Sequence, residues 1–238
     1  MKKLFKKDEV LFAVLWIILY VVSFSLADGL SEAAGIPKAV TVCVGAILSG
    51  ALAHFVQRNR LWSYLGLQKP KKQDRMLGYV PLIAITLLPL LCGVQAPDSA
   101  LAAILGVISM CFVSFLEEVI FRGLLFRAMS RSDLKTAVII SSVTFGAGHV
   151  VNLLMGAPVF DTMLQLVYAS AVGFCYTAVA IVGGSIWPCI LSHAIVNCIS
   201  VFAVEMSVQM KITIAVAQTV LGIGYGVWLL CRKGERIT

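Results

Sequence analysis

Charge is the scarcest property of this sequence, and its scarcity sets the class of protein. Only 13% of the 238 residues are Asp, Glu, Lys or Arg, whereas 60% are hydrophobic. A soluble domain carries about 25% charged residues and about 45–50% apolar ones. The shortage of charge therefore excludes an ordinary water-soluble domain and indicates that much of the surface faces lipid.

Other features that would indicate a different class of protein are also missing. The seven cysteines lie mostly in apolar runs and contain no CxxC spacing, which excludes a zinc knuckle and a disulfide framework. The glycines are scattered and form no phosphate-binding loop, and no internal repeat is present. The net charge is +7, but the basic residues lie in short tracts between apolar runs, so we expect no nucleic-acid partner.

Long apolar runs are what the sequence does contain. A transmembrane helix needs about 20 apolar residues to cross a hydrocarbon core of about 30 Å. We therefore predict an all-α fold, a polytopic membrane helix bundle of about eight transmembrane helices that forms a single membrane domain over residues 1–238. The predicted spans are Val10–Ala27, Ala39–Val56, Leu77–Gly93, Leu101–Arg122 with an extension to Met129, Thr136–Met155, Met163–Val182, Ile186–Val204 and Ile212–Leu230.

The distribution of basic residues predicts the orientation of this bundle. Lys and Arg precede the first span, fill the linker between the second and third, and follow the fourth and the eighth. The loops at the other end contain mostly acids, and their only bases are Lys38 and Lys211. Because Lys and Arg gather on the cytoplasmic side, we expect both termini to be cytoplasmic in a multi-pass protein of the cell membrane.

Two neighbouring acids interrupt the fourth apolar run, in the stretch SFLEEVIFR. A charged side chain within a span costs about 2.5–3.5 kcal/mol on insertion scales, so Glu117 and Glu118 are candidate functional residues. Glu118 and Arg122 are four residues apart and share one helix face. We expect them to pair, which leaves Glu117, about 100° further round the helix, to point elsewhere.

Two later spans contain histidines in similar surroundings. In FGAGH, Phe145 and His149 are four residues apart, and Gly146 and Gly148 thin the helix for close approach of a neighbour. In HAIVN, His193 and Asn197 also share a face of their helix. One such pair is typical of a helix–helix hydrogen bond, but three polar faces on separate spans indicate a shared site, which we expect in the inner half of the membrane.

These three motifs, in this order, resemble the CPBP family of intramembrane proteases, also called the CAAX-protease, bacteriocin-processing or Abi family. The resemblance covers roughly residues 109–200, within a motif-bearing core of about 101–204. It implies a helical bundle that hydrolyses a peptide bond in or near the membrane, with a membrane-embedded or lipidated peptide or protein as substrate. Bacterial relatives are linked to pheromone processing, bacteriocin immunity and protein turnover, and the short chain indicates a bacterial member.

Hydrolysis of an amide needs an activated water and donors for the oxyanion, and the motifs offer both. We expect Glu117 to act as the general base, His149 to share the water, and His193 and Asn197 to donate to the oxyanion, with Glu118 and Arg122 as their structural pair. The alternative is a metalloprotease in which Glu117, His149 and His193 hold a zinc ion. We favour the metal-free version because no helix carries a His-x-x-x-His pair.

Two other classes of function use the same residues. A proton- or cation-coupled transporter would use the acids and imidazoles as an ion path, although the sequence has no repeated halves of the kind that transporters often show. A non-catalytic bacteriocin-immunity or scaffold protein would keep the motifs for packing alone. The sequence gives no indication of oligomeric state.

Overall fold

A computed structural model describes residues 1–70, 79–97 and 99–234 of the chain, and it describes side chains as far as residue 232. A few residues used in the topology prediction lie outside this description: Lys71, Lys72, Arg75, Leu77, Asp98, Lys233 and Arg236.

The described chain is a bundle of helices, as predicted, and contains no strand. The elements in chain order are α1 (Lys2–Lys7), α2 (Glu9–Ala33), α3 (Ala39–Asn59), α4 (Val80–Leu87), η2 (Leu88–Cys92), α5 (Ala100–Glu118), η3 (Val119–Leu125), α6 (Phe126–Met129), α7 (Leu134–Ala147), η4 (Gly148–Met155), α8 (Val159–Gly183), α9 (Trp187–Ser200) and α10 (Val208–Gly234).

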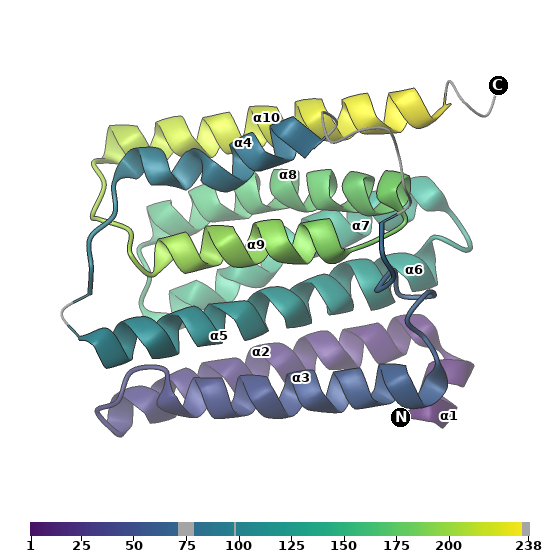
Figure 1. Cartoon of the computed structure of the whole chain (residues 1–238), viewed down its shortest axis with the longest axis horizontal. Coiled ribbons are helices and arrows are strands. Elements are labelled where there is room, and N and C mark those ends of the chain that lie inside the picture. The colour runs from purple at the N-terminus through teal and green to yellow at the C-terminus, as the bar shows by residue number, and fades with distance from the viewer. Residues whose placement is uncertain (71–78, 98, 235–238) are drawn as a thin grey trace.

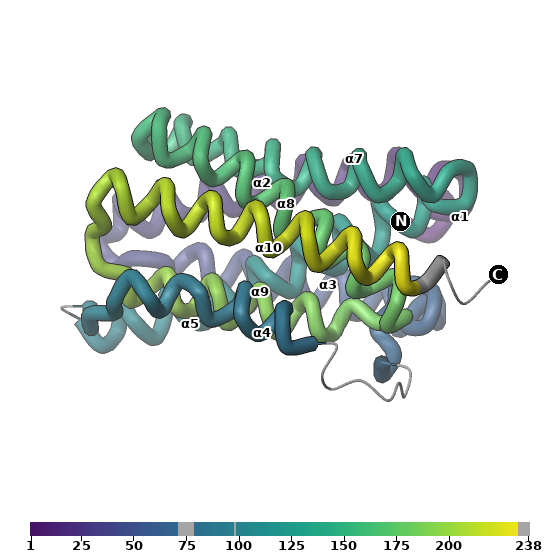
Figure 2. Tube along the Cα trace, turned by 90° about the horizontal axis from the view of Figure 1, so that it is seen from above, coloured from purple at the N-terminus to yellow at the C-terminus, as the bar shows by residue number. Residues whose placement is uncertain are grey.

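The helices run roughly side by side along one axis (Figure 1). The hairpin of α2 and α3 packs on α5 and η3, α5 packs on α9, and α8 packs between α7 and α10. Both views place α1 and the last turn of α10 at the same end of the bundle (Figures 1 and 2). We call this the terminal end, and the end with the α2–α3 loop the distal end.

Six helical segments are long and apolar enough to span a membrane: Glu9–Ala33, Ala39–Asn59, Ala100–Met129, Leu134–Met155, Val159–Gly183 and Val208–Arg232. Their exposed side chains are largely Leu, Ile and Val, which suits contact with lipid. The chain is therefore an integral membrane protein. The other two predicted spans correspond to shorter apolar helices, Val80–Cys92 and Trp187–Ser200, and both contain proline near their start.

The two ends of the bundle differ in how their charges are used. At the distal end, Lys38 pairs with Asp28 at 2.9 Å and Lys211 pairs with Asp161 at 2.6 Å. Each of the two exceptions to the predicted charge distribution is thus next to an acid. Apart from the buried Arg122, the other described basic residues lie at the terminal end, which is compatible with the prediction of cytoplasmic termini.

The helix with the two glutamates has a partly exposed first half and a buried second half. It begins at Ser99, whose side chain caps α5 by accepting from the Ala102 amide, and it continues without a break to Met129. Over Val119–Leu125 it widens into a π-helix, a feature that is frequent at functional sites. Every residue from Val119 to Phe126 is buried, so this segment forms the core around which the other helices pack.

Candidate active site

The pair of Glu118 and Arg122 is buried completely. Their side chains are both 0% exposed, and Arg122 Nη1 donates to Glu118 Oε1 at 2.8 Å, as the spacing predicts. The guanidinium carbon lies 4.1 Å from the Phe145 ring centroid. Room for it depends on Gly173 of α8, where a Cβ would stand 2.9 Å from Arg122 Nη2. The charge is therefore held by a carboxylate and an aromatic face rather than by water.

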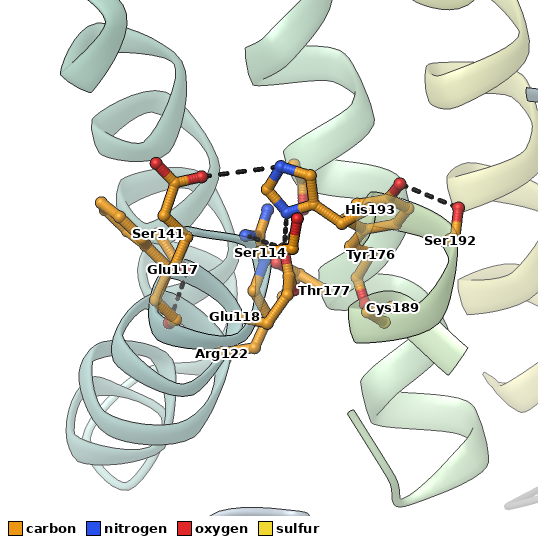
Figure 3. Close-up of polar contacts among 12 residues, drawn as sticks. Ser114, Glu117, Glu118, Arg122, Ser141, Tyr176, Thr177, Cys189, Ser192 and His193 are labelled. Carbon is orange, nitrogen blue, oxygen red and sulfur yellow. Dashed lines mark hydrogen bonds and ion pairs between the residues drawn. The ribbon is translucent and has the colours of Figure 1, made fainter. Parts of the chain in front are cut away.

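His193 lies between the two glutamates (Figure 3). Its Nδ1 is 3.0 Å from Glu118 Oε1, and its Nε2 is 3.6 Å from Glu117 Oε2. The Glu118 carboxylate is paired with the Arg122 cation, and an ionised carboxylate can only accept hydrogen bonds. The contact therefore requires a proton on His193 Nδ1. Glu118 therefore fixes the ring of His193 with Nε2 directed toward Glu117.

Glu117 has a different set of partners. Tyr20 of α2 donates a buried 2.7 Å hydrogen bond to Glu117 Oε1. The other oxygen, Oε2, faces His193 and has no hydrogen-bond partner among the described residues. The two adjacent glutamates thus differ in their partners: Glu118 Oε1 meets both Arg122 and His193, whereas Glu117 Oε1 accepts from a neutral hydroxyl and the side chain has no Lys or Arg partner among the described residues.

His149 enters the site from the start of η4, just beyond the last turn of α7. Its ring and that of His193 both meet Phe145 edge to face, with centroids 5.7 Å and 5.6 Å from the Phe145 centroid. Within the described part of the chain, His149 makes no hydrogen bond. Its ring nitrogens are therefore available to a substrate or water.

The two glycines of the FGAGH motif do different things. A Cβ on Gly146 would lie 2.0 Å from Ser170 Oγ and 2.7 Å from the Leu166 carbonyl oxygen, so α7 and α8 meet there as predicted. A Cβ on Gly148 would meet nothing within 4 Å, so the prediction of a close approach is wrong at this position. The reason is that the α-helix ends at Ala147, and Gly148 begins a 3₁₀ segment and lines a cavity.

Asn197 lies one turn beyond His193 on α9. Its Nδ2 donates to Ser114 Oγ at 3.0 Å, and Ser114 in turn donates to the Met110 carbonyl oxygen of α5. The amide is thus fixed in orientation by the helix that also carries the glutamates.

A cavity of about 290 Å³ reaches this group of residues. Glu117, His149 and Asn197 line it, together with Tyr20. Glu118, Arg122 and His193 are not among its lining residues and form a layer behind Glu117. The six predicted site residues therefore come together, but in two shells: three of them face the cavity, and three support them.

Tyr20 is the site residue that sequence reasoning missed. It lies on the first span, 97 positions from Glu117, in an apolar run where an aromatic residue is interpreted as part of the hydrophobic core. The sole available signal was that a buried tyrosine hydroxyl needs a hydrogen-bond partner. The same reasoning could have found Tyr176 and Ser192, whose hydroxyls are hydrogen-bonded at 2.8 Å behind the site.

The zinc alternative requires three ligands around one point. In residues 1–70, 79–97 and 99–234, no group of three or more His, Cys, Asp or Glu side chains is placed to hold a metal ion. Glu117 and His193 approach each other at 3.6 Å, and the Phe145 ring packs edge to face against both His193 and His149. The arrangement does not fit the predicted ligand set of Glu117, His149 and His193.

Comparison with protein families matches residues 99–199 to the Rce1-like type II CAAX prenyl endopeptidases. This confirms the resemblance to the CPBP family, and the matched segment contains all six predicted site residues. Comparisons with curated proteins and with solved structures found no match. Tyr20 lies outside the matched segment, on a helix that packs against it.

Proposed function

We propose that this integral membrane protein, whose residues 99–199 form an Rce1-like type II CAAX prenyl endopeptidase domain, is an intramembrane endopeptidase of the cell membrane. Its substrates are membrane-associated proteins or small peptides. The observation that carries the proposal is the difference between the adjacent carboxylates: Glu118 is paired with Arg122 and does not line the cavity, whereas Glu117 lines the cavity and accepts a hydrogen bond from the neutral hydroxyl of Tyr20.

Glu117 is the general base in this proposal. Tyr20 holds Oε1, so Oε2 accepts a proton from water in the cavity as the water oxygen attacks the carbonyl carbon of the substrate. The proton then passes from Glu117 to the amide nitrogen as the C–N bond breaks. General acid–base catalysis of this kind contributes about 10²–10⁴-fold to the rate.

The other residues stabilise charge or position Glu117. His149 and Asn197 line the cavity and can donate to the oxyanion, a contribution of about 10²–10³-fold for one donor. His193, oriented by Glu118, faces Glu117 Oε2 through Nε2: without a proton this nitrogen accepts a hydrogen bond from the protonated Glu117, and with a proton it donates to the Glu117 carboxylate. We include no metal-dependent step in this mechanism, because the described residues do not form the ligand set that a metal ion would need.

The test is a comparison of membrane and secreted peptides from cells that express the parent chain, Glu117→Gln or Glu32→Gln. Glu32 is an exposed acid at the distal end, so its substitution is a matched control for the chemical change. We expect an uncut substrate to accumulate with Glu117→Gln and not with Glu32→Gln. An unchanged peptide pattern with Glu117→Gln, at equal protein abundance, would contradict the proposal.

A further inference from the structure

The cavity beside Glu117 extends in one direction along the bundle. Its inner end is formed by Glu117 and Phe145. Its outer end is lined by Asp28, Lys38 and Ser200, which belong to α2, the start of α3 and the end of α9. These helix ends all lie at the distal end (Figure 1). The cavity thus extends from Glu117 toward the distal end.

Between Glu117 and the terminal end, tightly packed side chains leave no path along the helix. Each hydrophobic residue from Val119 to Phe126 is at most 4% exposed, and Arg122 is 0% exposed. The bulk of these side chains fills the space between α2, α7 and α8. A peptide that approached Glu117 along this helix from the terminal end would have to displace the core of the protein.

The length of the cavity suits a short stretch of extended chain. Tyr20 contacts Glu117 at the inner end, and Asp28 contacts Lys38 at the outer end. These positions on α2 are eight residues apart, an axial distance of about 12 Å. An extended peptide rises about 3.3 Å per residue, so roughly three to four residues fit between the mouth and Glu117.

The walls of the cavity contain polar side chains among apolar ones such as Val21, Phe24 and Met110. The hydroxyls and amides that line it include Ser25, Thr41, Ser109, Asn152 and Gln165. Such groups can exchange hydrogen bonds with a peptide backbone. An isoprenoid chain would remove them from water without replacing those bonds, which costs about 1–3 kcal/mol for each group.

We propose that the substrate is an extended, unprenylated polypeptide segment that reaches Glu117 from the distal end, past Asp28 and Lys38. In the orientation set by the basic residues, this end faces away from the cytoplasm, so the substrate is an exported peptide or the outer segment of a membrane protein. This inference rests on the proposed function and adds the side of access and the chemical class of the substrate.

The path can be tested without any cleavage assay, through two serines of one helix. Ser25 lines the cavity; Ser23 is at nearly the same depth, is also half-buried, and is about 200° away around the helix. Ser25→Cys and Ser23→Cys are treated in intact cells with a membrane-impermeant charged thiol reagent, and the natural cysteines of the parent chain set the background. We expect Ser25→Cys to react about tenfold faster or more, because thiol reactivity follows access to water.

The side of cleavage is tested with fluorescein-labelled casein added to right-side-out or inverted vesicles. The signal from Glu117→Gln vesicles is subtracted in each case. We expect hydrolysis by right-side-out vesicles, none by inverted vesicles, and equal hydrolysis once detergent opens both. The class of substrate is tested with a synthetic peptide, made with and without a farnesyl group. Its sequence contains the cleavage site identified by comparing peptides from cells that express the parent chain and Glu117→Gln. We expect the peptide without farnesyl to be cut at least as fast.

The outcomes separate this inference from the proposed function. Hydrolysis confined to inverted vesicles, equal labelling of the two cysteine variants, or a tenfold preference for the farnesylated peptide would each overturn the inference and leave the protease assignment intact. If the parent chain and Glu117→Gln hydrolysed casein equally in detergent, while Ser25→Cys was still labelled from outside, the proposed protease activity would be contradicted. The access of the cavity from the distal end would still be supported.

Discussion

Tyr20 of α2 donates its hydroxyl to Glu117 Oε1 of α5 at 2.7 Å, across 97 positions of sequence. The phenol packs against Phe24 with ring centroids 4.8 Å apart, so its position is fixed by the helix and by its neighbour. A carboxylate held by one oxygen cannot rotate freely. The bond therefore decides which oxygen of Glu117 meets the water.

Removal of this hydroxyl should slow the reaction without unfolding the protein. We expect Tyr20→Phe to lower kcat about tenfold to a hundredfold with KM nearly unchanged, because the base is misplaced while the cavity keeps its walls. Tyr64→Phe is the matched control, since it also removes a phenol–carboxylate hydrogen bond, to Glu9, at the terminal end. Steady-state kinetics on the identified peptide and thermal unfolding in detergent measure both effects. Equal loss of kcat in the two variants would show that Tyr20 has no specific role.

The buried Arg122 should matter to the fold as well as to the site. Substitution by Gln removes the cation from the Glu118 carboxylate at 0% exposure and leaves it the contact with His193; breaking a buried pair in this way costs about 3–5 kcal/mol. Lys211→Gln breaks the part-exposed pair with Asp161 and should cost about 0–1 kcal/mol. The free energy of unfolding of both variants in detergent checks this. A comparable loss in both would mean that burial does not distinguish the two pairs.

The two glycines of FGAGH provide a matched pair of substitutions. Gly146→Ala places a methyl group 2.7 Å from the Leu166 carbonyl oxygen, and backbone shifts of this kind cost about 1–3 kcal/mol. Gly148→Ala has open space around its Cβ, so its thermal unfolding should match that of the parent chain. If Gly148→Ala were the more destabilised variant, the placement of α7 against α8 would be wrong.

Cleavage should not depend on an added metal ion. We expect the purified protein to keep its activity after stringent chelation, with the metal content measured in the same sample, because the described residues do not form a ligand set. Activity that disappears on chelation and returns with Zn²⁺ alone would restore the metalloprotease alternative. Buffer exchange without chelator is the control for losses in handling.

The transporter alternative predicts a continuous polar path, and the buried segment from Val119 to Phe126 blocks one along the central helix. We therefore expect reconstituted vesicles to hold a pH gradient as well as protein-free vesicles do, as reported by a pH-sensitive dye inside them. A Glu117-dependent proton flux in protein that does not cleave peptides would favour the transporter.

Local spacing was enough to predict part of this structure. The Glu118–Arg122 pair follows from helix geometry, because residues four apart share a face whatever surrounds them. The all-helical fold follows from long apolar runs, since only a closed set of backbone hydrogen bonds is stable in lipid. Whether His149 forms a ligand set with Glu117 and His193, by contrast, depends on how separate helices pack around the Phe145 ring, and no spacing along one helix encodes it.

The partner of Glu117 was also beyond local reasoning. Tyr20 comes from a helix outside the matched segment, and nothing in its sequence neighbourhood distinguishes it from the other aromatic residues of α2. The direction of the cavity was unpredictable for a similar reason. Depth along a helix says how far a residue is from each face, but the packing of side chains decides on which side the space remains.

The ion pairs of Lys38 and Lys211 bear on how the chain is inserted. Moving one elementary charge against the membrane potential costs about 2.3 kcal/mol per 100 mV. A lysine that is carried to the outer face together with an aspartate transfers no net charge, so the electric field does no work on the pair. In the predicted orientation, the two loops can therefore be translocated in an energised membrane with their lysines in place, while the unbalanced cations stay on the cytoplasmic face and anchor it.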